Sequence, residues 1–282
     1  MTRIGLISDT HMPHRWDKLP QIVFDRFADV DLILHAGDVG ELWVLDQLGC
    51  CAPVIAVHGN DETAEATAAL PYLQTIAVGG QRIVLTHAHY PDRKEELDSR
   101  KSDDWLPKLQ RRADFAHQHQ ANIVVFGHTH IPMMTEFEGI WLINPGAIAS
   151  ANEVSRQRIQ TIAIMTLDES PVPQVEWITL QGQPYIPQVN LNAGFIAALE
   201  NVIEWIVEPK LRQSLLWLRS DVYPLAPDVI FDLIQNMART RWFTDAPNIT
   251  VKDVVESIQA QPDLPLLVLD KLRESEIFGV YL

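Results

Sequence analysis

Side chains that can bind metal ions recur at five places in the first half of the sequence. Each place is a run of four residues that contains Asp, Asn or His, namely Ser8-Asp9-Thr10-His11, His35-Ala36-Gly37-Asp38, His58-Gly59-Asn60-Asp61, Thr86-His87-Ala88-His89 and Gly127-His128-Thr129-His130. Carboxylates suit hard divalent ions and imidazole suits manganese, iron, zinc, cobalt and nickel, so the mixture favours a borderline transition metal. A carboxylate such as Asp38 can bridge two ions about 3.5–4 Å apart and trap a hydroxide between them. The residue types therefore predict a two-metal hydrolytic site.

Two of the runs repeat one spacing. Asp9 and His11 are separated by one residue, as are His128 and His130. On an extended backbone, alternate side chains point to the same side. The spacing therefore predicts that each pair faces one site from an extended segment.

Each run directly follows a predicted strand. Short apolar stretches predict buried strands at residues 4–7, 31–34, 54–57, 82–85 and 123–126. Helical patterns lie between them at 19–28, 42–48 and 94–119, with a kink or break expected at Pro107. This alternation predicts an α/β domain with a largely parallel sheet, whose ligands bind beyond the carboxyl ends of the strands. We therefore expect all five runs at the same end of one sheet.

The pattern changes after about residue 131. Shorter strands are predicted at 133–137, 140–143, 161–167 and 174–180, in a second sheet packed on the first. Two prolines and a glycine make residues 181–189 a predicted linker. Helices are predicted beyond it at 193–207, 209–218, 227–240, 251–261 and 266–276, with Thr250 and Asp228 as helix-start residues. The predicted organisation is a domain at 1–180, a linker at 181–189 and a helical extension at 190–282.

The composition excludes some classes of protein. The formal net charge is −15, which disfavours a nucleic-acid-binding module. The two cysteines, Cys50 and Cys51, are adjacent and predict reduced thiols rather than a disulfide. No signal peptide or membrane span is predicted, so we expect a cytoplasmic protein. The charged run at residues 92–104 predicts an exposed helical face or a lid.

The five runs resemble the motifs of the calcineurin-like metallophosphoesterase superfamily. The matching motifs are D-x-H at Asp9–His11, G-D at Gly37-Asp38, G-N at Gly59-Asn60, T-H-x-H at Thr86–His89 and G-H-T-H at Gly127–His130. The N-P-G turn at residues 144–146 makes the chain similar to the small bacterial and archaeal phosphodiesterase branch. The resemblance covers residues 1 to about 180. It implies an αββα four-layer fold, a β-sandwich flanked by helices, followed by the mainly α-helical extension.

The resemblance also implies a role for each motif residue. One divalent ion would be held by Asp9, His11, Asp38 and His130, and the other by Asp38, Asn60, His87 and His128. Manganese is the expected metal, with iron, zinc, nickel and cobalt as alternatives. The implied nucleophile is a metal-bridging hydroxide that attacks phosphorus in line. Asn144 is expected to brace the site through the N-P-G turn.

The third motif departs from the family pattern. Many members read G-N-H-[DE], whereas this chain reads Gly59-Asn60-Asp61-Glu62 and lacks the histidine that approaches the phosphate. His89 is the preferred substitute as general acid or phosphate contact, with a hydrogen bond to a metal ligand as the alternative. Asp61 is a second candidate catalytic residue, with turn or helix capping as its alternative role. His58 is a further nearby alternative.

Three functions follow from this interpretation. The first is a metal-dependent phosphodiesterase acting on a small-molecule phosphate ester. The second is a phosphomonoesterase or nucleotide hydrolase, and the third is a non-catalytic scaffold built on the phosphoesterase fold. For residues 190–282 a helical cap, a homodimer interface and a docking site for a protein partner are all open.

Overall fold

The computed structural model describes residues 1–244, 246–262 and 264–282. They form two compact units. Unit 1 consists of Met1–Ala151 and Gln157–Ile203, and unit 2 of Asn152–Arg156 and Glu204–Leu282. Residues 181–189, where the sequence predicts a linker, lie within unit 1.

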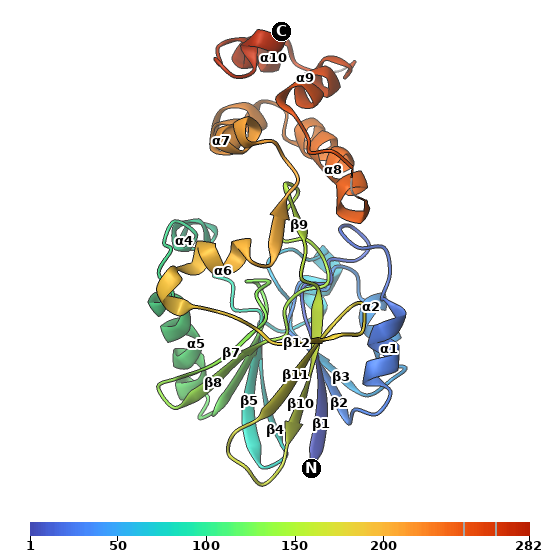
Figure 1. Cartoon of the computed structure of the whole chain (residues 1–282), viewed down its shortest axis with the longest axis vertical. Coiled ribbons are helices and arrows are strands. Elements are labelled where there is room, and N and C mark those ends of the chain that lie inside the picture. Colours follow the sequence, from blue (N-terminus) through green and yellow to red (C-terminus); the bar gives the residue numbers. More distant parts are fainter. Residues whose placement is uncertain (245, 263) are drawn as a thin grey trace. The chain divides into compact units, whose positions relative to one another are not determined.

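Unit 1 contains a six-stranded sheet (Figure 1). Its strands, in spatial order, are β12 (Pro184–Tyr185), β11 (Gln174–Thr179), β10 (Thr161–Leu167), β1 (Thr2–Ile7), β2 (Leu32–His35) and β3 (Val54–Ala56). β1, β2 and β3 run parallel, whereas β10 pairs antiparallel with β1 and with β11. The predicted parallel strands are therefore one half of a mixed sheet.

A five-stranded sheet completes the β-structure of the sandwich. Its order is β4 (Leu73–Val78), β5 (Gln81–Thr86), β6 (Ile123–Phe126), β8 (Ile140–Asn144) and β7 (Met133–Phe137). β5, β6 and β8 are parallel, and the edge strands β4 and β7 are antiparallel to their neighbours.

The predicted division of strands between the sheets is wrong. Strands 133–137 and 140–143 do not share a sheet with strands 161–167 and 174–180, because β8 pairs with β6 while β10 pairs with β1. The five strands that precede the metal-type runs are also divided, three in one sheet and two in the other. Sheet membership depends on pairing between strands distant in sequence, which local patterns do not encode.

The two sheets pack face to face. Ile4 and Leu6 of β1 and Ile83 and Leu85 of β5 belong to one fully buried apolar cluster. Successive strand side chains point to opposite faces, so Ile7 instead joins the cluster on the outer face of its sheet. The result is a β-sandwich with one apolar layer between the sheets.

Helices cover the outer faces (Figure 1). On the six-stranded sheet, α1 (Gln21–Phe27) and α2 (Trp43–Leu48) share an apolar cluster with Ile7. These helices are seven and six residues long, too short to be stable alone, so packing must hold them. A side chain on Gly5 would lie 3.0 Å from the Phe27 ring, and its absence lets α1 approach the sheet. The αββα architecture expected from the resemblance is thus present.

The other helical layer contains the predicted break. The pattern at 94–119 forms α4 (Arg93–Ser99) and α5 (Leu106–Gln118), with Pro107 in the first turn of α5. Proline suits a first turn because its missing N–H would have no helical acceptor there. Leu109, Ala113 and Ala116 form the buried side of α5. α3 (Ala64–Ala69) and β4 were not predicted.

The rest of unit 1 includes the start of the predicted helical extension. The pattern at 193–207 forms the 3₁₀ turn Leu191–Ala193 and α6 (Phe195–Glu200), and then ends. Residues 203–205, of which Glu204 and Trp205 already belong to unit 2, instead form the short strand β13 (Ile203–Trp205), which pairs with β9 (Ser155–Gln157). Burial alternates in β13, as in a strand and not as in a helix.

Unit 2 is mainly helical. It contains α7 (Pro209–Trp217), α8 (Pro227–Phe243), α9 (Val251–Gln259) and α10 (Leu266–Arg273), which share an apolar core. Thr250 caps α9 as predicted, in a capping box with Asp253. Asp228 lies in the first turn of α8, whose N-cap is Ala226. Across the described residues, no helix is both long enough and apolar enough to cross a membrane.

Candidate metal centre

The loops that follow β1, β2, β5 and β6 bring ionisable side chains together. One group consists of Asp9, His11 and His130, which offer ligand atoms within 4.8 Å of one another. Asp9, Asp38 and His87 do the same. All five side chains are buried, and Asp9 belongs to both groups.

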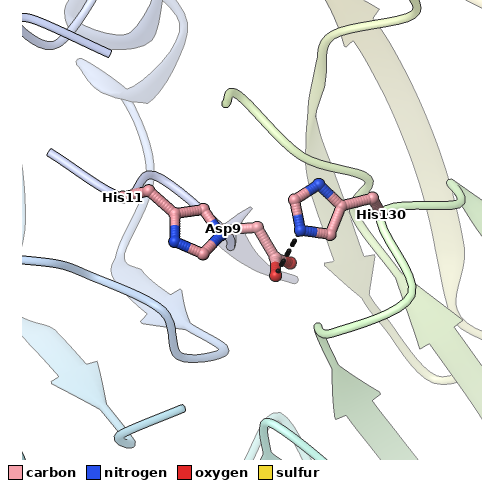
Figure 2. Close-up of side chains that lie close together, drawn as sticks. All are labelled: Asp9, His11 and His130. Atoms are coloured by element: carbon pink, nitrogen blue, oxygen red, sulfur yellow. Dashed lines mark ion pairs between the residues drawn. The ribbon is translucent and has the colours of Figure 1, made fainter. Parts of the chain in front are cut away.

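The first group is shown in Figure 2. His130 Nε2 lies 3.1 Å from Asp9 Oδ1, and the rings of His11 and His130 stack with centroids 5.5 Å apart. His130 Nδ1 lies 3.1 Å from the carbonyl oxygen of Ala149, to which it can donate a proton. This bond leaves the lone pair of Nε2 directed at the Asp9 carboxylate.

Asp38 connects the two groups. Its Oδ2 atom lies 3.5 Å from His11 Nε2 and 3.2 Å from His87 Nε2. His87 Nδ1 lies 2.8 Å from the carbonyl oxygen of Ala36, which again leaves Nε2 facing the carboxylate. Asp38 therefore lies between the residues assigned by resemblance to different ions.

The loops reach this geometry through left-handed backbone and not through extended segments. The φ angles of Asp9, His11, Asp38, His128 and His130 lie between 44° and 69°. The extended-backbone prediction is therefore wrong, because each segment turns immediately after its strand. Left-handed conformations of non-glycine residues cost roughly 1–3 kcal/mol each and cluster at functional sites.

Charge in the cluster favours ionised carboxylates. Burial opposes ionisation of Asp9, but interaction with His130, when that ring is protonated, outweighs it and lowers the pKa of Asp9 from 3.8 to about 2. Burial likewise opposes ionisation of Asp38, whose pKa lies well below its ordinary value because of His87 and His11. Burial acts against protonation of His87, yet Asp38 raises its pKa to about 9. Two buried carboxylates thus need positive charge beside them.

The donor set fits divalent cations. His11 Nε2 and His87 Nε2 are buried and have no hydrogen-bond partner among the described residues. Buried polar atoms are rarely left unpaired, and such exceptions call for an explanation. Imidazole nitrogens facing two carboxylates match the ligands preferred by first-row transition metals.

His128 lies beside the cluster and makes a bond that was not predicted. Its ring centroid is 5.0 Å from that of His87, and its backbone N–H donates to the Asp9 carboxylate at 3.2 Å. Its Nε2 lies 2.9 Å from Oε1 of Glu96, a buried residue of α4. The prediction that residues 92–104 form an exposed face is therefore wrong at Glu96.

Asn60 is not brought into the cluster by any side-chain bond. Its side chain is exposed, and none of the hydrogen bonds among the described residues joins it to the other candidate ligands. Its neighbour Gly59 packs directly on Asp38, where a Cβ atom would collide with the carboxylate. The loop that carries Asn60 is thus close to the cluster.

Two further residues stabilise the loops. The Glu62 carboxylate accepts hydrogen bonds from the backbone N–H groups of Val39, Gly40 and Gly59 at 2.8–3.0 Å. It was not predicted, although the acidic position of the G-N-H-[DE] motif could have indicated it. Asn144 donates to the Gly127 carbonyl and to Thr129 at 3.0 and 3.1 Å, so it holds the loop that carries His128 and His130.

His89 is buried behind the cluster. Its ring lies 5.5 Å from that of His87 and 5.7 Å from that of His58, measured between centroids. Burial, together with the charges of His87 and His128, lowers the pKa of His89 to about 3. The ring is therefore neutral near pH 7.

Asp61 lies at the more exposed side of the cluster. Its carboxylate pairs with Arg15 and lies 3.6 Å from His11 Nδ1. Its backbone N–H donates to Asp38 Oδ1 at 2.8 Å. Arg15 also donates to the carbonyl oxygens of Ser150 and Ala151 at 3.2 and 3.1 Å. Where many family members have the histidine, this chain thus has Asp61 in an ion pair with Arg15.

Comparisons with known proteins agree on one family. A family model described as the calcineurin-like phosphoesterase superfamily domain matches residues 2–170. A probable metallophosphoesterase of Methanothermobacter thermautotrophicus is 35% identical over 144 residues, which are 51% of this chain and 76% of that protein. A phosphodiesterase of Methanocaldococcus jannaschii is 25% identical over 161 residues, 51% of this chain and 82% of that protein.

Solved structures show a similar fold. Vps29 of Entamoeba histolytica, in a structure complexed with Zn²⁺, has a TM-score of 0.50 and 22% identity, and the match covers 69% of this chain and 99% of that chain. At this level of identity the likeness concerns the fold alone. Residues 171–282 lie beyond the matched family model.

Proposed function

Because the chain belongs to the calcineurin-like phosphoesterase superfamily, we propose that it is a dinuclear metal-dependent phosphodiesterase. The observation that carries the proposal is the pair of buried ligand groups that share Asp9, with Asp38 Oδ2 3.5 Å from His11 Nε2 and 3.2 Å from His87 Nε2. Few arrangements other than a cation site explain two buried carboxylates beside unpaired imidazole nitrogens.

The proposed ligands divide between two ions. Asp9, His11, Asp38 and His130 would hold one ion, and Asp38, Asn60, His87 and His128 the other, with Mn²⁺ as the proposed metal. When bound, such ions neutralise charge on a phosphate ester and make a water molecule nucleophilic at neutral pH. Asn60 is the one proposed ligand of the second ion that is exposed to solvent.

The surrounding residues fix the orientation of the proposed metal ligands. The Ala36 and Ala149 carbonyls fix the rings of His87 and His130, so that each presents Nε2 to the carboxylates. Such outer hydrogen bonds set the tautomer and orientation of a histidine ligand. Glu62 holds the loops of Asp38 and Asn60 together through three backbone N–H groups.

Two residues, His89 and Asp61, are proposed to take over the role of the missing histidine. His89, being neutral near pH 7, would contribute an N–H donor to the substrate or to a ligand, and not an imidazolium acid. Asp61 would hold Arg15 beside His11, which places a positive charge next to the proposed metal ligands. Without a strong general acid, esters with good leaving groups should be the best substrates.

Preference for diesters is supported by the phosphodiesterase relative. The test is hydrolysis of bis(p-nitrophenyl) phosphate and of p-nitrophenyl phosphate by one preparation, with and without Mn²⁺. We expect Mn²⁺-dependent turnover that is faster with the diester. A faster monoester would favour the phosphomonoesterase alternative. No turnover by folded protein with Mn²⁺, Co²⁺, Ni²⁺ or Zn²⁺ would favour the scaffold alternative.

A further inference from the structure

Glu96 places a buried carboxylate against a proposed metal ligand. Its Oε1 atom lies 2.9 Å from His128 Nε2, and the two side chains are 2% and 17% exposed. Buried glutamates are rare unless paired. Glu96 is also the only fully buried residue of α4, whose one leucine, Leu97, is partly exposed.

The carboxylate is held from three sides. Besides His128, the Tyr90 backbone N–H donates to Oε2 at 3.0 Å and Arg100 Nε donates to Oε1 at 2.7 Å. The group is therefore a fixed acceptor and not a mobile surface charge.

Because Arg100 donates to Oε1 and Tyr90 to Oε2, both oxygens of Glu96 act as acceptors, and this places the proton of a neutral His128 ring on Nε2. A neutral imidazole with a proton on Nε2 keeps its lone pair on Nδ1, the nitrogen then available to a cation. The same ring is confined by His87, whose ring meets it at 70°. Both the tautomer and the ring orientation are thereby set.

We propose that Glu96 is a positioning residue that presents Nδ1 of His128 to a divalent ion. The inference rests on the proposed function, because it concerns the ion assigned to Asp38, Asn60, His87 and His128. It connects α4, outside the family motifs, to the metal centre. Loss of such an outer partner lowers metal affinity by about 10- to 100-fold in other metalloproteins.

The first experiment needs no metal. Long-range ¹H–¹⁵N NMR correlations report which ring nitrogen of each histidine carries a proton, and the His128→Gln variant assigns the His128 signals. In the metal-free full chain we expect the Nε2–H form for wild type and for Glu95→Gln, and a mixture of tautomers for Glu96→Ala. An Nδ1–H form in wild type, or no change in Glu96→Ala, would overturn the proposal.

The second experiment measures Mn²⁺ affinity by equilibrium dialysis. We expect one of the two sites to lose about 10- to 100-fold in Glu96→Ala and less in Glu96→Gln, whose single amide oxygen can still accept the His128 proton although the Tyr90 N–H loses its acceptor. Glu95→Gln is the matched control, because Glu95 is the exposed neighbour on the same helix. The Gln variant also covers the case in which Glu96→Ala does not fold.

The two hypotheses fail differently. Wild-type protein that binds two ions, with Glu96 variants that bind them equally well, would overturn the positioning role alone. Wild-type protein that binds no Mn²⁺ would overturn the proposed function and the metal part of this inference with it.

Discussion

The two units bury different kinds of side chain. In unit 1 the buried residues include ionisable side chains such as Asp9, Asp38, His87 and Glu96, whereas the buried polar side chains described in unit 2 are two serines, Ser155 and Ser214. Burying charge costs several kcal/mol per group unless a partner compensates. Unit 1 thus contains buried ionisable groups that need compensating partners, while unit 2 is organised by apolar packing. The comparison predicts that ligand and metal changes act on unit 1, and packing changes on unit 2.

The largest expected effect is on activity in unit 1. Asp38→Asn removes the charge that lies between the two proposed ion sites, so diester hydrolysis should fall to background and bound Mn²⁺ should decrease. Activity assays with elemental analysis measure both. Circular dichroism checks that the variant folds, and retained activity with retained metal would contradict the assignment of Asp38.

A core substitution in unit 2 should lower stability and leave metal binding unchanged. Leu272 is fully buried in the cluster of α7–α10, and Leu272→Ala should lower the free energy of unfolding by about 2–5 kcal/mol, because it removes apolar contacts and leaves a cavity. Urea denaturation gives the change. Mn²⁺ affinity should stay at the wild-type value, and a parallel loss of affinity would show that the division between the units is not functional.

Metal binding should stabilise unit 1 selectively. At a free Mn²⁺ concentration 100 times the Kd, binding at a single site adds about 2.7 kcal/mol to the free energy of unfolding of the unit that contains the site. Hydrogen–deuterium exchange should therefore slow in the loops after β1, β2, β5 and β6 and stay constant in α7–α10. Equal protection of both units would mean that they unfold as one cooperative body.

The smallest effect concerns the capping box of α9. Thr250→Ala should cost about 1 kcal/mol of stability, whereas Thr250→Ser should cost little because it keeps the hydroxyl. The hydrogen bond from the Thr250 backbone lowers the pKa of Asp253. A carboxyl with a lowered folded-state pKa stabilises the fold above its unfolded-state pKa, and this contribution is lost as pH falls through the folded-state value. Urea melts between pH 7 and pH 3 should show this loss in wild type and a weaker one in Asp253→Asn.

Much of the fold was predictable from short-range pattern. The strands at 4–7, 54–57 and 123–126 appear because apolar runs ended by turn residues encode strands locally. The sheet to which each strand belongs was not predictable, since β8 and β10 choose partners distant in sequence. The site was likewise predictable only in part. The motifs identified the loops that carry the polar side chains, but they did not indicate the left-handed backbone of these loops.

The residues that support the site were harder to find. Glu96 lies in a run of charges whose usual environment is solvent, and only the folding of α4 onto the loops buries it. Glu62 acts through backbone N–H groups, which carry no sequence signal of their own. Asn144, by contrast, was predicted to brace the site because it belongs to a recognisable N-P-G turn.

The five residues 152–156 have a consequence for dissection of the chain. Within unit 2, Arg156 pairs with Glu204 at 2.7 Å and donates to the Thr244 carbonyl at 2.8 Å, and the Trp242 indole donates to the Ser155 carbonyl at 3.1 Å. The polypeptide therefore crosses between the units three times, after Ala151, after Arg156 and after Ile203. A stop codon near residue 203 would not excise unit 2 cleanly, since it would strand an internal segment whose bonding partners had been deleted. A protease cut at any one of the three crossings would likewise leave the two units linked by the polypeptide at the other two crossings.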